Sequence, residues 1–305
     1  RQRQMCIRDS IFTVPPAHAK AARAWLDRGI GLNGSSPRHG AATVFVRDGD
    51  RGVETLMLHR PGRQAMGTLS FPGGITETSD DEPLDWRGPS SAEWAHKLLS
   101  EDIGLARRSL VTAARKTFVE AGILFAGTPM HGVAENVEGV DWMRSRELLA
   151  TEDISFADLL AKRSMAFHSE CLRPLSHWAT SDFVHQRLDL LFFAAAVPVG
   201  QRHCALATQR GRAWLGWVDA RALLEDPWST DVPETFRQQA EDSARSDDPW
   251  HFDLEELTTP GVRCAVEAVA EASSAVAFLA ARRDMRVKRP RLDLRDGEPV
   301  LVLDG

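Results

Sequence analysis

The sequence lacks tyrosine and contains very little lysine. Five of its 37 basic residues are lysines (Lys20, Lys97, Lys116, Lys162 and Lys288), so 37 − 5 leaves 32 arginines in 305 residues. We interpret both features as a result of GC-rich coding, which favours a bacterial source, rather than as a sign of special chemistry.

Cysteine is also scarce, and the four cysteines (Cys6, Cys171, Cys204 and Cys264) form no CxxC pair. This spacing argues against a zinc site or a disulfide framework and favours a reducing, cytoplasmic setting. No apolar run approaches the ~20 residues needed to span a bilayer. The formal charge of −6 argues against a nucleic-acid or anionic-membrane partner. Nothing in the sequence defines an oligomeric state.

The first ten residues differ in character from the rest of the chain. Residues 4–10 read QMCIRDS, which can be back-translated to a string resembling a transposon-end sequencing adaptor. We therefore expect residues 1–10 to be a non-native tail and exclude them from the fold. The composition then predicts an N-terminal extension (11–40), a main domain (41–228), a helical extension (229–285) and a tail (286–305).

Helical and strand patterns alternate irregularly along the chain, which predicts an α/β or α+β fold with a mixed sheet. Residues 41–48 and 53–60 are β-rich and flank the turn signal GDRG, so they predict a hairpin. Pro72-Gly73-Gly74 predicts a sharp chain reversal. The other predicted strands are 123–127, 187–200, the first part of 213–226 and the strand-prone tail. The predicted helices are 18–28, 91–104 capped by Ser90 or Ser91, 105–122, one or two within 144–165, the second part of 213–226, 233–245 and 262–285.

The helix predicted at 105–122, with Gly122 as its C-cap, carries the most informative stretch, AARKTFVEAG at residues 113–122. Positions three and four apart share a helix face, so residues 116, 119 and 120 are neighbours, and we expect 116 and 119 to be at least partly solvated in a cleft. Carboxylates at all three positions would form an acidic patch able to hold Mg²⁺ or Mn²⁺. Here the residues are Lys116, Val119 and Glu120, and an ion pair between Lys116 and Glu120 is expected.

Together with the upstream FPGGITETSD, this helix resembles the Nudix hydrolase signature. In that signature a Gly-Gly loop and a later acid precede a run of Arg-Glu-apolar-x-Glu-Glu-x-Gly-apolar. The loop is Gly73-Gly74, the later acid is Asp80, and the run begins at Arg115 and ends at residue 123.

An insertion at residues 81–114 separates the two halves of the signature. The inserted form resembles the Nudix subfamily related to acyl-CoA diphosphatases. The resemblance implies an α/β/α sandwich with a mixed sheet, an insertion inside the Nudix box and extra C-terminal helices.

The resemblance also implies roles for individual residues. Glu120 and Arg115 take the catalytic positions, and Glu120 and Asp80 are the candidate ligands of Mg²⁺ or Mn²⁺. The candidates for substrate and phosphate binding are Gly73, Gly74, Lys116 and Asp189. Lys116 and Val119 replace two of the three box glutamates, so the box is degenerate and metal binding is expected to be weak. A histidine such as His168, His177, His185 or His203 is a candidate substitute for the missing base.

Three functions are consistent with these residues. The first is a weakened, metal-dependent hydrolase of a diphosphate linkage in a nucleotide- or CoA-type substrate. The second is a non-catalytic Nudix-fold protein that binds such a ligand or regulates a partner. The third is a protein in which the fold persists and the cleft is unused. Metal binding distinguishes the first from the other two, because the hydrolase requires it.

Overall fold

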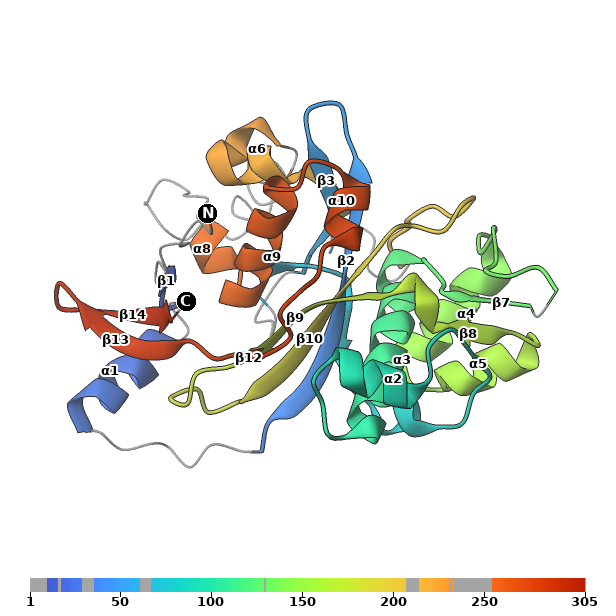
Figure 1. Cartoon of the computed structure of the whole chain (residues 1–305), viewed down its shortest axis with the longest axis horizontal. Coiled ribbons are helices and arrows are strands. Elements are labelled where there is room, and N and C mark those ends of the chain that lie inside the picture. The colour runs from blue at the N-terminus through green and yellow to red at the C-terminus, as the bar shows by residue number, and fades with distance from the viewer. Residues whose placement is uncertain are drawn as a thin grey trace, which may run out of the picture.

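The computed structural model describes residues 10–15, 18–28, 36–60, 67–128, 130–206, 214–230, 232 and 254–304. These residues form an α/β fold in which helices cover both faces of a central mixed sheet (Figure 1). Within this part of the chain, no helix is both long and apolar enough to cross a membrane.

The central sheet has eight strands, and its main path runs β11-β3-β2-β10-β9-β12. The short strands β4 and β5 add to β3 and β2 respectively. The β10–β2 and β12–β9 pairs are parallel, and the other pairs are antiparallel. The strands are β2 (Arg38–Asp48), β3 (Val53–His59), β4 (Leu69–Ser70), β5 (Gly73–Ile75), β9 (Arg173–Ala179), β10 (Leu188–Ala195), β11 (Trp214–Asp219) and β12 (Val287–Lys288).

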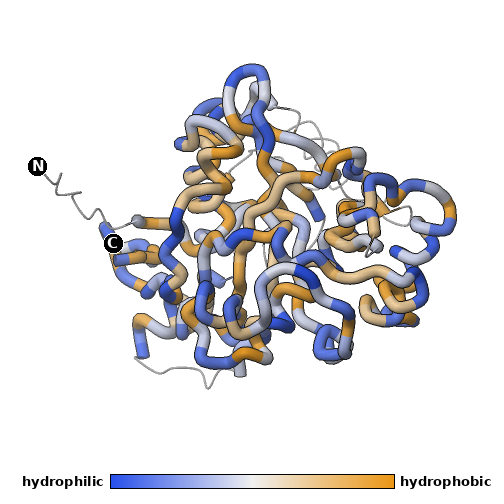
Figure 2. The backbone as a smooth tube through the Cα atoms, turned by 45° about the vertical axis from the view of Figure 1, so that its right-hand side comes forward, coloured by the Kyte–Doolittle hydropathy of each residue, from blue (hydrophilic) through white to orange (hydrophobic). Residues whose placement is uncertain are grey.

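The predicted hairpin is confirmed by the pairing of β2 with β3, in which Val46 lies opposite Thr55. The turn is closed by the Gly49 amide, which donates to the Gly52 carbonyl at 2.8 Å. Figure 2 shows this hairpin tip as a hydrophilic loop, whereas the strands below it are largely hydrophobic. Polar residues therefore end the strands, as the sequence pattern predicted.

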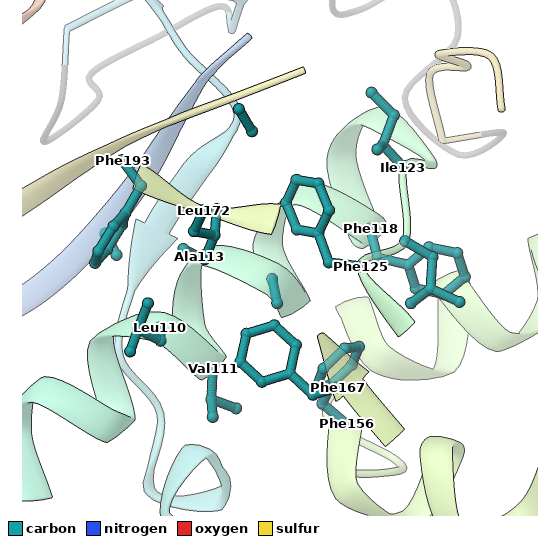
Figure 3. Close-up of a cluster of buried hydrophobic side chains, with 14 of the residues drawn as sticks. Leu110, Val111, Ala113, Phe118, Ile123, Phe125, Phe156, Phe167, Leu172 and Phe193 are labelled. Atoms are coloured by element: carbon teal, nitrogen blue, oxygen red, sulfur yellow. The ribbon is translucent and has the colours of Figure 1, made fainter. Parts of the chain in front are cut away.

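One face of the sheet is covered by α3 and the elements around it, which form the right-hand part of Figure 1. An aromatic-rich core lies between α3 and the sheet (Figure 3) and includes Phe118, Phe125 and Phe193, each fully buried. The elements are α2 (Ser91–Lys97), α3 (Ile103–Ala121), α4 (Val140–Ala150), α5 (Phe156–Lys162), the short strands β6 (Trp86–Arg87), β7 (Ala126–Gly127) and β8 (Ala166–His168), and the 3₁₀ turns Thr78–Asp81 and Ser169–Cys171.

Two predicted boundaries in this region were wrong. The helix predicted at 91–104 ends at Lys97, and Gly104 lies instead in the first turn of α3. The Asp102 side chain causes the break, because its Oδ1 accepts the Leu105 amide at 2.9 Å and starts a new helix. The strand predicted at 123–127 is reduced to the two residues of β7. The prediction of one or two helices within 144–165 corresponds to α4 and α5.

The opposite face of the sheet is covered by C-terminal helices. Alternation along β10 separates the two cores, since Leu191 and Phe193 face α3 whereas Leu190 and Phe192 face these helices. The helices are α6 (Ala220–Glu225), α8 (Leu254–Leu257), α9 (Pro260–Ala270) and α10 (Ala275–Ala280), with a 3₁₀ turn at Pro227–Ser229. The helix predicted at 233–245 lies outside the described residues.

The single helix predicted at 262–285 is in fact two, α9 and α10. The Ser274 hydroxyl accepts the Ala277 amide at 3.1 Å and thereby caps a separate helix. The Asp48 carboxylate, which accepts the Ala275 amide at 2.7 Å, attaches this new helix start to the end of β2. Residues 260–280 therefore pack on the sheet as two separate helices.

The two ends of the described chain meet in a second, three-stranded sheet of order β1-β14-β13. Ser10 pairs with Leu303 in this sheet, so the strand begins at the last residue of the proposed adaptor tail. The predicted strand character of the C-terminal tail is confirmed here. The elements are β1 (Ser10–Thr13), β13 (Arg291–Arg295), β14 (Glu298–Leu303) and the adjacent helix α1 (Ala19–Arg28).

Candidate functional site

The C-terminal half of α3 and strand β5 form the candidate site. Helix α3 ends at Gly122, which adopts the left-handed conformation (φ 71°) and donates its amide to the Phe118 carbonyl at 3.0 Å. A hydrogen bond between the hydroxyls of Thr117 and Thr43 (2.9 Å) joins the helix to β2. This bond fixes the position of α3 along β2, the strand that pairs with β5. It thereby sets where the signature residues of α3 lie relative to Gly73 and Gly74.

Arg115 is the buried centre of the site, with a side chain only 1% exposed. Its Nε and Nη2 donate to the two carboxylate oxygens of Asp80 at 2.6 and 2.7 Å, and its Nη1 donates to Glu77 Oε1 at 2.7 Å. Burial disfavours the charged guanidinium, but the Asp80 and Glu77 carboxylates outweigh it and raise the pKa of Arg115. The two halves of the signature are thus joined by a bidentate ion pair between α3 and the 78–81 turn.

Asp80 is fully buried, and its carboxylate accepts four hydrogen bonds from the protein. Besides Arg115, its Oδ2 accepts the Thr112 hydroxyl at 2.7 Å and the Glu77 amide at 3.0 Å. This carboxylate therefore holds the turn against the helix. A role as a metal ligand, which the resemblance implied, would require Asp80 to leave these partners.

Lys116 lies one residue along α3 and is paired with Glu77, not with Glu120 as expected. Its Nζ donates to Glu77 Oε1 at 2.8 Å, and its side chain remains 23% exposed. The stem of the lysine runs beside β5, since a Cβ on Gly74 would come within 2.9 Å of Lys116 Cε. The i,i+4 spacing therefore predicted the wrong partner for Lys116, because the Glu77 carboxylate, which lies outside the helix, is closer to the ammonium.

Glu120 is held by an arginine that belongs to no sequence motif. Arg60, which directly follows β3, donates from Nε to Glu120 Oε1 at 3.0 Å and from Nη2 to Oε2 at 2.5 Å. Glu120 Oε2 also accepts the Gly73 amide at 2.7 Å. Both side chains are mostly buried, with 14% of Arg60 and 11% of Glu120 exposed. Both oxygens of Glu120 therefore accept hydrogen bonds from the protein.

Gly73 and Gly74 belong to strand β5 and do not form the predicted chain reversal. They pair with Ala42 and Ala41 of β2. A Cβ on Gly73 would lie 2.6 Å from the Ala41 carbonyl oxygen, so the position needs glycine for space. The expected close approach of this backbone to α3 is present in the Gly73–Glu120 hydrogen bond.

Val119 is buried, which contradicts the expectation of a partly solvated position. Its side chain belongs to the aromatic-rich core and the residue is 5% exposed. Its carbonyl accepts two hydrogen bonds from Arg146 of α4, at 3.2 Å from Nε and 2.8 Å from Nη2. Val119 thus extends the core toward α4.

Asp189 lies on β10 in a cluster with two histidines. Its Oδ1 is 2.6 Å from His177 Nε2 and 3.8 Å from His39 Nδ1. Burial opposes the charged form, but the hydrogen bond and charge of His177, with a smaller contribution from His39, lower the pKa of Asp189. The cluster is built on β2, β9 and β10, whereas the box residues lie at β5, α3 and the 78–81 turn. A role of Asp189 in phosphate binding, like that of Lys116, remains a prediction.

The box cluster is electrically balanced within itself. Three carboxylates (Glu77, Asp80 and Glu120) contact three cations (Arg60, Arg115 and Lys116). Among the described residues, no group of three or more His, Cys, Asp or Glu side chains is arranged to hold a metal ion. The residues present therefore do not fit Mg²⁺ or Mn²⁺, which need oxygens not already bound to fixed cations.

Comparisons with solved structures define the fold. The chain is similar to a NUDIX hydrolase from Alicyclobacillus acidocaldarius, with a TM-score of 0.57 and 20% identity over 82% of this chain and 98% of that one. The fold is therefore the Nudix fold, as the sequence predicted. At this identity the likeness defines the fold alone. No protein-family model and no curated protein sequence matches the chain.

Other solved Nudix structures are less similar to the chain. A MutT protein from Bacillus halodurans has a TM-score of 0.34 at 13% identity, over 87% of this chain and 97% of that one. The NUDIX domain of Shewanella oneidensis NrtR, crystallised with ADP ribose, has a TM-score of 0.31 at 10% identity, over 71% and 97%.

Proposed function

We propose that this protein binds a nucleotide-diphosphate or CoA-type ligand through its Nudix fold and does not hydrolyse it by the metal-dependent route. One observation supports the proposal most strongly: each carboxylate of the box cluster already contacts a protein cation. A divalent ion bound to Glu120 or Asp80 would have to displace Arg60 or Arg115, and either displacement leaves a mostly buried guanidinium without its partner.

The proposed ligand class follows from the sequence resemblance, and Lys116 is the cation best placed to meet it. Its ammonium is partly exposed and donates to Glu77. A phosphate oxygen can replace the Glu77 oxygen at this ammonium, because lysine binds phosphate as a point charge on a flexible stem. The glycine backbone of β5 runs alongside the stem of this lysine.

A weakened hydrolase using Mg²⁺ or Mn²⁺ is the second candidate. The arrangement of Glu120, Gly73, Arg115 and Asp80 favours it, since these residues converge as the Nudix signature requires. The Nudix fold itself is shared with a hydrolase. The cofactor, the acyl-CoA diphosphatase relationship and the bacterial, cytoplasmic setting remain proposals.

Binding and turnover assays distinguish the two candidates. We expect ADP-ribose, NADH or CoA to bind in EDTA by isothermal titration calorimetry, with no increase in affinity when Mg²⁺ is added. Lys116→Ala should weaken that binding about tenfold, the loss of one charge-assisted phosphate contact. Lys162→Ala, which removes an exposed lysine from α5, is the matched control and should leave the affinity unchanged.

Hydrolysis would contradict the proposal in a specific way. If the wild-type protein releases phosphate-containing products in a Mg²⁺-dependent reaction, and Glu120→Gln abolishes it while the exposed control Glu101→Gln does not, the hydrolase is correct. If none of the three ligands binds and none is cleaved, the proposal fails in favour of an unused cleft.

A further inference from the structure

Arg60 directs its guanidinium at oxygen atoms from three different elements. Besides the two oxygens of Glu120, its Nη2 donates to the Gly73 carbonyl at 3.0 Å and its Nη1 donates to the Ser70 hydroxyl at 2.8 Å. The side chain thus joins the end of β3 to β4, β5 and α3. Its own amide is held by the Thr68 carbonyl at 2.8 Å.

These acceptors are the kind of ligands that a hard divalent cation takes. Mg²⁺, Mn²⁺ and Ca²⁺ are bound through carboxylate, backbone carbonyl and other neutral oxygens. Here a carboxylate, a carbonyl and a hydroxyl converge on a single positive group. The Gly73 amide, which donates to Glu120 Oε2 at 2.7 Å, further fixes the orientation of the carboxylate.

We propose that Arg60 is a built-in cation that occupies a latent divalent-metal site formed by Glu120, Gly73 and Ser70. The guanidinium neutralises Glu120 and holds β5 against α3, so the site is complete without a metal. The inference rests on the proposed function, since a wild-type protein that used a metal at Glu120 would have to displace Arg60. The new claim is that Arg60 alone excludes a divalent ion from Glu120.

The burial of Glu120 makes this carboxylate sensitive to the loss of Arg60. With 11% of its side chain exposed, Glu120 would keep its hydrogen bond from the Gly73 amide but lose both hydrogen bonds from its cation. A mostly buried carboxylate without a cation is strongly unfavourable, so the vacated site favours another cation. The space vacated by the guanidinium lies next to the remaining oxygen ligands.

If Arg60 only stabilises the structure and does not occupy a metal site, a different result is expected. Arg60 joins four elements, so its removal would destabilise the protein whether or not the oxygens can hold an ion. Rescue by a divalent cation, dependent on Glu120, separates the two explanations. The readout is therefore metal binding and metal-dependent stability, neither of which requires catalytic activity.

The experiment compares five forms of the full chain: wild type, Arg60→Ala, Arg60→Gln, Arg60→Ala with Glu120→Gln, and Arg47→Ala. Arg47 is the matched control, because it pairs with Glu54 at the surface. Free Mn²⁺ is followed by electron paramagnetic resonance during titration, and melting temperatures are measured with EDTA, Mg²⁺ or Mn²⁺. Arg60→Gln tests the same point with less loss of side-chain volume if the alanine variant does not fold.

We expect Arg60→Ala to melt about 5 °C or more below wild type in EDTA. Mn²⁺ should recover most of that loss and bind with a stoichiometry of one, and the added Glu120→Gln should abolish both effects. Wild type and Arg47→Ala should show neither. If both Arg60 variants bind no Mn²⁺ and gain no stability from it, the latent site does not exist. If wild type itself binds Mn²⁺ in a Glu120-dependent manner, the proposed function fails as well.

Discussion

Replacing Arg115 by alanine should lower the free energy of unfolding by about 3–5 kcal/mol, the usual cost of breaking a buried ion pair from one side. The guanidinium is 1% exposed and its principal partner Asp80 is fully buried, so the Asp80 carboxylate that is left behind cannot be solvated after the change. Arg115→Ala would leave Asp80 with only the Thr112 hydroxyl and the Glu77 amide. Urea denaturation followed by circular dichroism measures the loss.

Arg108→Ala is the control for this prediction. Arg108 belongs to the same helix and pairs with Asp81 at 2.7 Å, but both side chains are substantially exposed, at 33% and 46%. Its removal should cost less than about 1 kcal/mol, as for other exposed ion pairs. Equal losses in the two variants would show that the Arg115 network is no more buried or important than a surface pair.

Val119→Glu should be the more damaging of two changes that place glutamates at positions 116 and 119. The residue is 5% exposed and packs in the aromatic-rich core, so the new carboxylate would be buried without a designed partner. We expect a loss of at least about 3 kcal/mol. Lys116→Glu should cost less, because position 116 is 23% exposed and the change mainly creates repulsion with Glu77.

Urea titrations of the two single variants and the double variant test this ranking. This ranking differs from the sequence expectation that positions 116 and 119 are both partly solvated, which would give a modest loss at each. A small loss for Val119→Glu, comparable with that of Lys116→Glu, would mean that the helix face opens toward solvent. The replaced glutamate would then be easy to restore, and the core packing seen around residue 119 would be unimportant.

Much of the fold was predictable because it depends on local patterns. The β2–β3 hairpin follows from alternating strand residues and a turn signal, and the C-cap of α3 follows from Gly122. The errors occurred where one side chain changes the course of the chain. Asp102 separates α2 from α3 and Ser274 separates α9 from α10, and each capping residue lies inside a run that favours helix.

The candidate site was predictable only in part, because a linear motif contains half of it. The motif brought together Gly73, Asp80, Arg115 and Glu120, and the structure joins them in two contacts, Gly73 with Glu120 and Asp80 with Arg115. Arg60 lies 60 positions before Glu120 and belongs to no motif, so only the folded sheet brings it to the carboxylate. For the same reason the sequence predicted an ion pair between Lys116 and Glu120. The actual partner, Glu77, lies beside the 78–81 turn and reaches Lys116 only in the folded structure.

The burial of Val119 shows a further limit of predicting a helix from its sequence. Residues 119 and 120 are adjacent and differ by about 100° around the helix, so one can face the core while the other faces β5. Position 119 was expected beside the cleft because a glutamate is usual there. Helix α4, which contributes Arg146 to the Val119 carbonyl, closes over that side.

The most direct test of a metal-free site is a crystal structure of the wild-type protein grown with Mn²⁺, with anomalous data to locate the ion. We predict that Arg60 keeps both of its hydrogen bonds to Glu120 and that no anomalous peak lies within coordination distance, about 2.2 Å, of Glu120 or the Gly73 carbonyl. A manganese ion bound to Glu120 with the Arg60 guanidinium displaced would contradict this and identify the site as that of a metal-dependent enzyme.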